Sequence, residues 1–259
     1  MRTVAATRYV TPLREGGSLP AIVEADDSGL YVVKFRGAGQ GRKALVAELV
    51  AGELARAAGL RVPELVRVEV DAALGRNEPD PEIRELLRAS AGMNLGLDYL
   101  PGSITFDPVA APPPLPEEAS AVVWFDAFVM NVDRTPRNPN LLVWHRQLWL
   151  IDHGAALYFH HAWDGADERS GSPFPAVKDH VLLPWATQLA GAGAKLGSVL
   201  TPGAFARAVA EVPDGWLEGE PRFASAAEHR AAYVRWLERR LEAAPLFVEE
   251  AERARAALV

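Results

Sequence analysis

The chain of 259 residues contains no cysteine, which excludes disulfide bonds, thiolate metal sites and cysteine nucleophiles. It also lacks an excess of basic residues. Its formal net charge is −7, so direct binding to nucleic acid is not expected. No apolar run reaches the length of a membrane span, and the first residues lack the apolar core of a signal peptide. We therefore expect a cytoplasmic protein without a membrane segment.

The composition is that of a folded protein, with 49% hydrophobic residues and seven tryptophans. A chain of this length can form one large domain or two closely packed lobes. Strand-like runs in the first part are bounded by turn residues such as those of "DDSG". They predict strands over residues 19–25, 29–35, 61–70 and 93–103.

Helical spacing predicts a long helix over 41–60 and a short one over 80–90. The apolar stretch 116–131 begins with Pro and two Glu, which favours a buried helix. A hairpin over 140–152 is expected to turn near His145 and Arg146. Further helical segments are predicted over 176–194, 202–211, 224–243 and 245–258. The fold class is therefore α+β, with a β-rich first part that carries one long helix, and a mainly helical second part.

A glycine-rich stretch, "RGAGQGRKA", precedes the long helix at residues 36–44. It does not have the spacing of a P-loop, and Ala44 stands where a hydroxyl would be required for Mg²⁺. A P-loop nucleotide site is thus excluded. Arg42 and Lys43 remain candidates for a helper role near phosphate, because they lie at a helix N-terminus.

Lys34 closes an apolar strand, and Glu48 lies among apolar residues on the helix that follows. A carboxylate in apolar surroundings needs a partner, and Lys34 is the candidate. Glu53 is a rival, but it falls on a different side of the helix. A strand lysine paired with a helix glutamate is the arrangement that kinases use to hold ATP phosphates.

Three further polar residues surround the predicted hairpin: Asp133, Asn138 and Asp152. Asp133 and Asn138 alone would indicate a turn, because Asp and Asn are frequent there. Together with Asp152 at the end of the hairpin, they offer a base for a hydroxyl and oxygen ligands for Mg²⁺. Asn140 is a second amide nearby, although the spacing favours Asn138.

"NVDRTPRN" followed by "LWLIDHG" resembles the catalytic and metal-binding loops of the HipA-like kinases. "VAELVAGELARAAGLRVPEL" resembles the glutamate-bearing helix of that family, and the resemblance covers most of residues 10–160. It implies a two-lobed, protein-kinase-like fold with lobes at 1–102 and 103–259. The last hundred residues carry no motif that can be transferred.

The resemblance also implies roles for single residues. Asp133 would be the catalytic aspartate, Asn138 and Asp152 the metal ligands, Lys34 a contact to ATP phosphates, and Glu48 its partner. A covering loop would be formed by Gly16, Gly17 and Ser18, and the hinge at 97–102 would meet adenine through Asp98, Tyr99 and Leu100. Two departures stand out: Arg134-Thr135 replaces an Arg-His pair, and the covering loop has few glycines. Phosphorylation of Ser18 is a further hypothesis.

These features predict an enzyme that uses ATP and Mg²⁺ to phosphorylate a hydroxyl, either Ser or Thr of a protein or a small molecule. One alternative is a nucleotide-binding pseudokinase with a regulatory role. Another is a metal hydrolase built on Asp152, His153, His160 and His161, although their spacing matches no known metal motif. A toxin role does not follow from the resemblance, since no region for a DNA-binding partner is recognisable.

Overall fold

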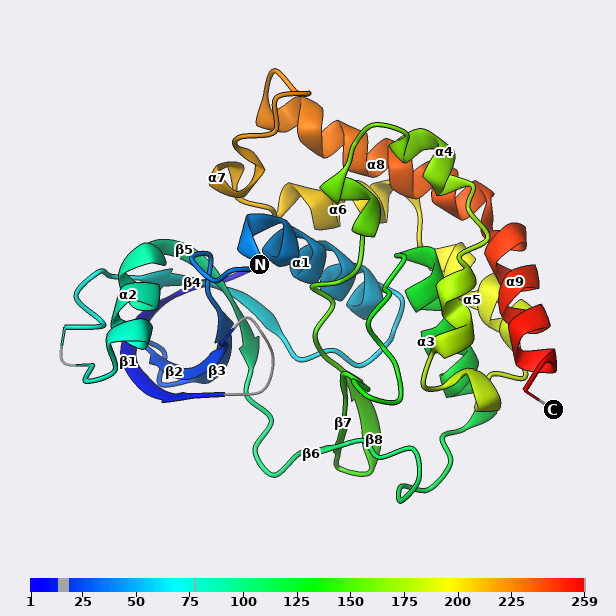
Figure 1. Cartoon of the computed structure of the whole chain (residues 1–259), viewed down its shortest axis with the longest axis horizontal. Coiled ribbons are helices and arrows are strands. Elements are labelled where there is room, and N and C mark those ends of the chain that lie inside the picture. The colour runs from blue at the N-terminus through cyan, green and yellow to red at the C-terminus, as the bar shows by residue number, and fades with distance from the viewer. Residues whose placement is uncertain (14–18, 77, 259) are drawn as a thin grey trace.

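The computed structural model describes residues 1–13, 19–76 and 78–258 (Figure 1). Its first part is a closed five-stranded barrel with the strand order β1-β2-β3-β5-β4. The barrel closes where the first residues of β1 pair in parallel with β4, Thr3 opposite Arg67. The strands are β1 Thr3–Pro12, β2 Ala21–Ala25, β3 Leu30–Lys34, β4 Leu65–Val70 and β5 Gly92–Asp98.

Alternating side chains fill the barrel, because successive residues of a strand point to opposite faces. Val23, Val33 and Val68 are fully buried in one apolar cluster. The helix α2, Pro81–Ala89, adds Ile83 and Leu87 to that cluster. The barrel thus has a core of its own.

The strand register determines what the outer face of the barrel presents. Lys34 is paired with Leu95, and Val32 is paired with both Ile22 and Leu97. Paired side chains share a face, so these five residues lie on the same outer side. Ile22, Val32 and Lys34 are only half-buried there. An apolar patch therefore continues from Lys34 along the barrel wall.

The long helix α1, Gly41–Ala57, joins the barrel to the rest of the molecule (Figure 1). Ten of its residues are buried, and eight of these belong to the second and larger apolar cluster. The helix packs on β4 and β5, and also on α6, Pro202–Ala210, and α7, Asp214–Leu217. It ends close to the predicted stop, with Gly59 at φ +80°.

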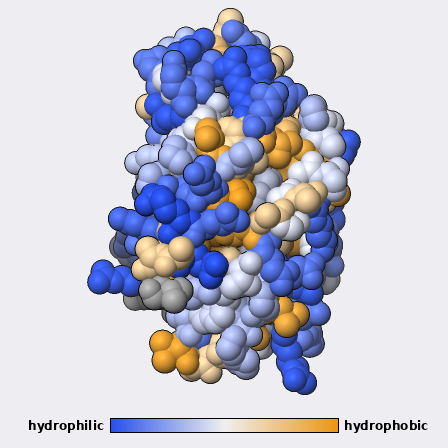
Figure 2. Space-filling view, turned by 90° about the vertical axis from the view of Figure 1, so that its right-hand side faces the viewer, coloured by the Kyte–Doolittle hydropathy of each residue, from blue (hydrophilic) through white to orange (hydrophobic). Residues whose placement is uncertain are grey.

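The second part is mainly helical, as predicted, and is centred on the buried helix α3, Pro116–Phe128. The stacked rings of Trp124 and Phe128 lie in its core. Hydrophilic side chains cover most of the face toward α5 and α9, with apolar residues between them near its centre (Figure 2). The remaining helices are α4 Ala166–Ser170, α5 Leu189–Val199, α8 Ala226–Glu242 and α9 Ala244–Ala256, and the 3-10 turns are Tyr158–His161, Pro175–Asp179 and Leu183–Trp185.

The second part also contains a small sheet, formed by β6 Ile104–Thr105, β7 Leu141–Trp144 and β8 Gln147–Leu150. The predicted hairpin is confirmed. Its turn residues, His145 and Arg146, have φ values of +48° and +63°. Positive φ at both central residues matches the twist of the flanking strands. The hairpin is thus a rigid support for the residue that follows it, Asp152.

The α+β composition is confirmed, but several elements differ from the prediction. The expected helix 176–194 is two 3-10 turns followed by α5, since Pro184 interrupts it. The expected strand 61–70 starts only at Leu65, after Pro63. The sequence did not indicate β1, β6, α4 or α7. No helix in the described ranges is long and apolar enough to cross a membrane.

Candidate active site

Lys34, Glu48 and Asp152 meet at one point, although they come from β3, α1 and the segment after β8. The Lys34 Nζ atom lies 2.5 Å from Glu48 Oε2 and 2.5 Å from Asp152 Oδ1. The Glu48 side chain is completely buried, and that of Lys34 is 12% exposed. The predicted lysine–glutamate pair is therefore formed, and the aspartate after the hairpin joins it.

The charges of this cluster stabilise each other. Burial by itself lowers the pKa of Lys34, but the negative charges of Glu48 and Asp152 outweigh it and raise that pKa. Burial by itself raises the pKa of Glu48, but Lys34 and then His153 bring it well below its usual range. Both members of the buried pair are thus ionised at neutral pH.

His153 lies beneath this cluster and is fully buried. Its Nδ1 atom is 3.6 Å from Glu48 Oε1, and its ring meets Phe125 edge-on. His160 is also buried, with its Nδ1 atom 3.0 Å from the Tyr233 hydroxyl. Within the described ranges, no three His, Asp or Glu side chains gather to hold a metal.

Asp133 lies in the loop between α3 and the hairpin, with both candidate amides beside it. Asn138 Nδ2 donates to Asp133 Oδ2 at 2.7 Å, and Asn140 Nδ2 is 3.5 Å from the same oxygen. Asn138 is exposed, whereas Asn140 is buried at φ +49°. Both amides are close enough to serve the same site, and Asn138 makes the shorter contact.

The acidic groups of the site fit a divalent cation. Burial raises the pKa of Asp133, and the negative charge of Asp152 raises it further. Two carboxylates that repel each other in this way favour a cation between them. Asp133, Asp152 and Asn138 supply only oxygen ligands, which are the ligands that Mg²⁺ prefers. The residues present thus fit Mg²⁺.

A buried network beneath the loop was not predicted from the sequence. Asp126, fully buried in α3, accepts from Arg134 Nε at 2.5 Å, and its Oδ2 lies 2.9 Å from His180 Nε2. Arg134 Nη1 also donates to the carbonyl oxygens of Asn140 and Ile151. Arg134 therefore ties the Asp133 loop to both strands of the hairpin. The only signal for Asp126 was a lone acid within the apolar run "VVWFDAF".

The charge state of this network is also clear. Burial by itself raises the pKa of Asp126, but Arg134 and then His180 reverse the effect and bring it below its usual range. Asp126 and Arg134 are thus a buried ion pair, both with 0% exposed side chains. Such a pair holds its geometry strictly, because separating it leaves a buried charge without compensation.

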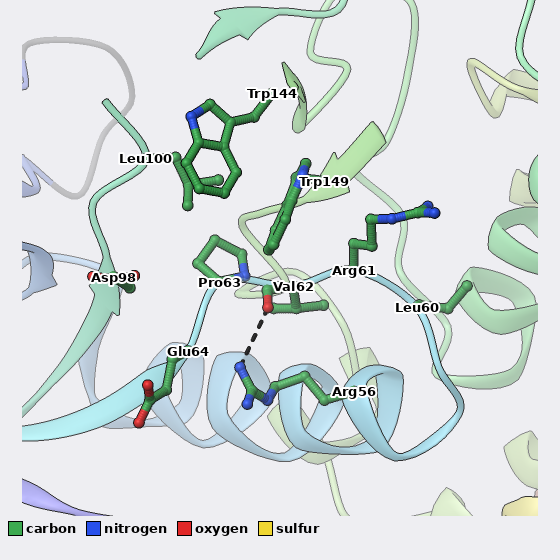
Figure 3. Close-up of a pocket in the computed structure, with 10 residues that line it drawn as sticks. All are labelled: Arg56, Leu60, Arg61, Val62, Pro63, Glu64, Asp98, Leu100, Trp144 and Trp149. Atoms are coloured by element: carbon green, nitrogen blue, oxygen red, sulfur yellow. Dashed lines mark hydrogen bonds between the residues drawn. The ribbon is translucent and has the colours of Figure 1, made fainter. Parts of the chain in front are cut away.

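The predicted hinge residues do not point toward Lys34. Asp98 and Leu100 line a separate cavity of about 390 Å³, which does not include Lys34, Asp133 or Asp152 (Figure 3). The backbone of Tyr99 pairs with β3 through a 2.9 Å bond to Leu30 O. The amide N–H groups of Asp98 and Tyr99 are thus already bonded within the structure. Gly16, Gly17 and Ser18 lie outside the described residues.

Arg42 and Lys43, considered above as phosphate contacts, instead bind the second part of the chain. Arg42 Nη1 donates to Gly215 O at 2.6 Å, and Lys43 Nζ donates to His160 O at 2.6 Å and to Glu220 Oε2 at 3.1 Å. Gly215 and Glu220 belong to the segment 211–220, which also binds the barrel, since Arg67 Nη2 donates to Glu211 Oε2 at 2.5 Å. We call residues 211–220 the α1 clamp. It fixes the helix that carries Glu48.

Known proteins share both the sequence pattern and the fold of this chain. A sequence profile of the HipA-like kinases matches residues 7–245. No curated protein matches the chain significantly. The fold is similar to that of a Helicobacter pylori proinflammatory kinase, CtkA, with a TM-score of 0.59 and 14% identity, over 99% of this chain and 100% of the other. That likeness supports the fold alone. The family profile covers nearly the whole sequence, and the chain therefore belongs to the HipA-like kinase family.

Proposed function

We propose that this kinase transfers the γ-phosphate of ATP to a hydroxyl group in a Mg²⁺-dependent reaction. The observation that carries the proposal is the position of the Lys34 ammonium, 2.5 Å from both Glu48 and Asp152. Kinases need a fixed cation for the phosphates and an acid close by for the metal. Here three separate elements converge to provide both.

In this proposal, Lys34 binds the phosphates and Glu48 holds Lys34 in position. The apolar patch formed by Ile22, Val32 and Leu97 would receive the adenine ring, with the backbone of the hinge beside it. The covering loop with Gly16, Gly17 and Ser18 stays a prediction. Of the hinge residues, Asp98, Tyr99 and Leu100 would contribute main-chain atoms.

Asn138 and Asp152 would hold Mg²⁺, which neutralises charge on the phosphates when it is bound. The oxygen of the attacking hydroxyl would form a bond to the γ-phosphorus, and Asp133 would accept the proton that this hydroxyl loses. The bond between that phosphorus and the leaving oxygen of ADP breaks in the same step. Arg134 fixes the position of Asp133 relative to the hairpin, since its side chain binds the carbonyls of Asn140 and Ile151.

We also propose two lobes that meet near residue 102, with the barrel in the lobe 1–102 and the hairpin and helices in 103–259. The separate core of the barrel supports this division. α1 belongs to the first lobe by sequence, but its buried residues join the core of the second. For this reason we expect α1 to move with the second lobe.

The acceptor is proposed to be Ser or Thr of a protein, with a small-molecule hydroxyl as the alternative. The pseudokinase alternative is weakened because all four residues are present and in contact as two pairs, Lys34 with Asp152 and Asn138 with Asp133. A catalytically inactive module has no need of all four.

The test is ADP release and ³²P transfer from labelled ATP by the purified chain, with and without Mg²⁺. Wild type is compared with Asp133→Asn, which removes the proton acceptor but keeps the shape. We expect the rate to fall by about 10²–10⁴-fold, with ATP binding retained. Asp164→Asn is the control, since its side chain is fully exposed. Equal rates for wild type and Asp133→Asn would refute the assignment.

A further inference from the structure

The cavity of about 390 Å³ lies where three parts of the chain meet (Figure 3). The connection from α1 to β4 contributes residues 60–64, the hinge contributes Asp98 and Leu100, and the hairpin contributes Trp144 and Trp149. Each of these parts also carries or adjoins an element of the active site. The cavity itself contains none of the residues assigned to phosphates or metal.

Two tryptophans form a fixed aromatic wall of the cavity. The rings of Trp144 and Trp149 meet edge to face, with centroids 5.2 Å apart. Trp144 Nε1 donates to Pro101 O at 2.9 Å, which holds the indole against the hinge. In the close-up, Leu100 lies beside Trp144, and Pro63 lies beside Trp149 (Figure 3). Aromatic faces next to proline and leucine accept a side chain with an aliphatic body.

The charged residues at the rim are not equally free. Arg61 is paired with Glu118 at 2.8 Å, and Glu64 is paired with Arg2 at 2.9 Å. Arg56 donates to the carbonyl of Val62 at 3.3 Å and lies 3.9 Å from Glu53. Asp98 is different, because its carboxylate makes no hydrogen bond or ion pair within the described ranges. The rim therefore offers one unpaired negative charge in the same cavity as the two indole rings.

The pKa of Asp98 and the indole rings that line the same cavity both favour the binding of a cation. Burial raises the pKa of Asp98, and the nearby negative charge of Glu64 raises it further. A bound cation would relieve both effects. Indole rings also attract cations, through the negative charge of their faces.

We propose that this cavity docks a peptide segment in which an arginine or lysine adjoins a large apolar residue. The apolar side chain would pack between Trp149, Pro63 and Leu100. The basic side chain would lie across Trp144 and pair with Asp98. The site is distinct from the phosphate-transfer site and holds whether or not the chain is an active kinase.

The experiment is calorimetric titration of the full chain with acetyl-Ala-Leu-Arg-Leu-Ala-amide. Two matched probes replace Arg by Glu, or both Leu by Ala. The variants are Asp98→Asn, which removes the charge but keeps the shape, and Trp144→Ala, which removes the wall. Asp179→Asn, an exposed acid outside the cavity, is the control. The titrations are repeated with saturating ATP and Mg²⁺ to separate this cavity from the nucleotide site.

We expect the arginine peptide to bind about tenfold more tightly than either matched probe, with or without ATP. Asp98→Asn should weaken binding by about fivefold and Trp144→Ala by about tenfold, while Asp179→Asn has no effect. The proposal is overturned if no peptide binds at millimolar concentration, or if the Glu peptide binds equally well. It is also overturned if ATP displaces the peptide, or if Asp98→Asn, which retains the folded shape, binds as wild type does.

Discussion

Lys34 and Glu48 form an ion pair across the interface between the barrel and α1, with Nζ and Oε2 2.5 Å apart. The Glu48 carboxylate has no exposed surface, so its charge depends on Lys34 for compensation. The pair links strand β3 to the helix that packs against the second part of the chain. It is thus part of the stability of the protein as well as of its proposed chemistry.

The first prediction tests this dependence. Lys34→Met should lower the free energy of unfolding by about 3–5 kcal/mol, because it leaves the Glu48 charge buried and unpaired. The double variant Lys34→Met with Glu48→Gln should recover most of that loss, since no charge remains uncompensated. Urea unfolding of the wild type, both single variants and the double variant provides the cycle. Additive losses would show that the two residues are not coupled.

The second prediction separates Asn138 from Asn140. Asn138 is exposed, so Asn138→Ala should leave stability within about 0.5 kcal/mol of wild type. It should raise the Mg²⁺ concentration needed for half-maximal ATP turnover. Asn140 lies at φ +49°, and Asn140→Ala should cost about 1 kcal/mol of backbone strain, which Asn140→Gly avoids. If Asn140→Gly alone changes the Mg²⁺ requirement, the metal ligand is Asn140.

The sequence was most informative where a polar residue stood in an unexpected place. Lys34 at the end of an apolar strand and Glu48 on an apolar helix were sufficient to predict their pairing, which is confirmed. The hairpin was equally predictable, because its two strands are adjacent in sequence and its turn is short. These features depend on local pattern or on a single strong charge requirement.

Other features depend on contacts between distant segments, which a single sequence does not reveal. Barrel closure needs β1 to pair with β4, about sixty residues away, and β1 is largely exposed, so it has no clear alternation. The Asp126–Arg134–His180 network unites a helix, a loop and the end of a 3-10 turn, and no local pattern in the sequence joins these three residues. The orientation of Asp98 away from Lys34 follows from strand register, which the hinge sequence does not specify.

The third prediction concerns the α1 clamp, residues 211–220. Lys43 joins the first turn of α1 to Glu220 and to His160 O, so Lys43→Met should loosen the helix that carries Glu48. We expect about a fivefold loss of kcat/KM for ATP, in line with the loss of partly exposed polar contacts. Arg88→Met on α2 is the control, because Arg88 is exposed and pairs only within its own helix. Unchanged kinetics for Lys43→Met would show that the clamp does not position Glu48.

The last prediction concerns stability in mild acid. Burial lowers the pKa of both His160 and His180 below the usual 6.5. Below pH 6.5 the unfolded chain therefore binds protons at these histidines that the folded chain does not. Each should reduce stability by up to about 1.4 kcal/mol per pH unit as the pH falls.

Burial also lowers the pKa of His161 and His229, so the part due to His160 is obtained by comparing a His160 variant with wild type between pH 6.5 and 5. The pKa values of Asp126 and Glu48 are lowered in the folded protein. Their contribution to stability is therefore fully present above their unfolded pKa values of 3.8 and 4.5, and it is lost only at lower pH. His160→Asn should be less stable at pH 7.5, because the bond to Tyr233 is lost, but its stability should fall less steeply below pH 6.5. Urea unfolding at half-unit pH steps measures both curves. Parallel curves would mean that His160 takes up a proton in the folded state as readily as in the unfolded one.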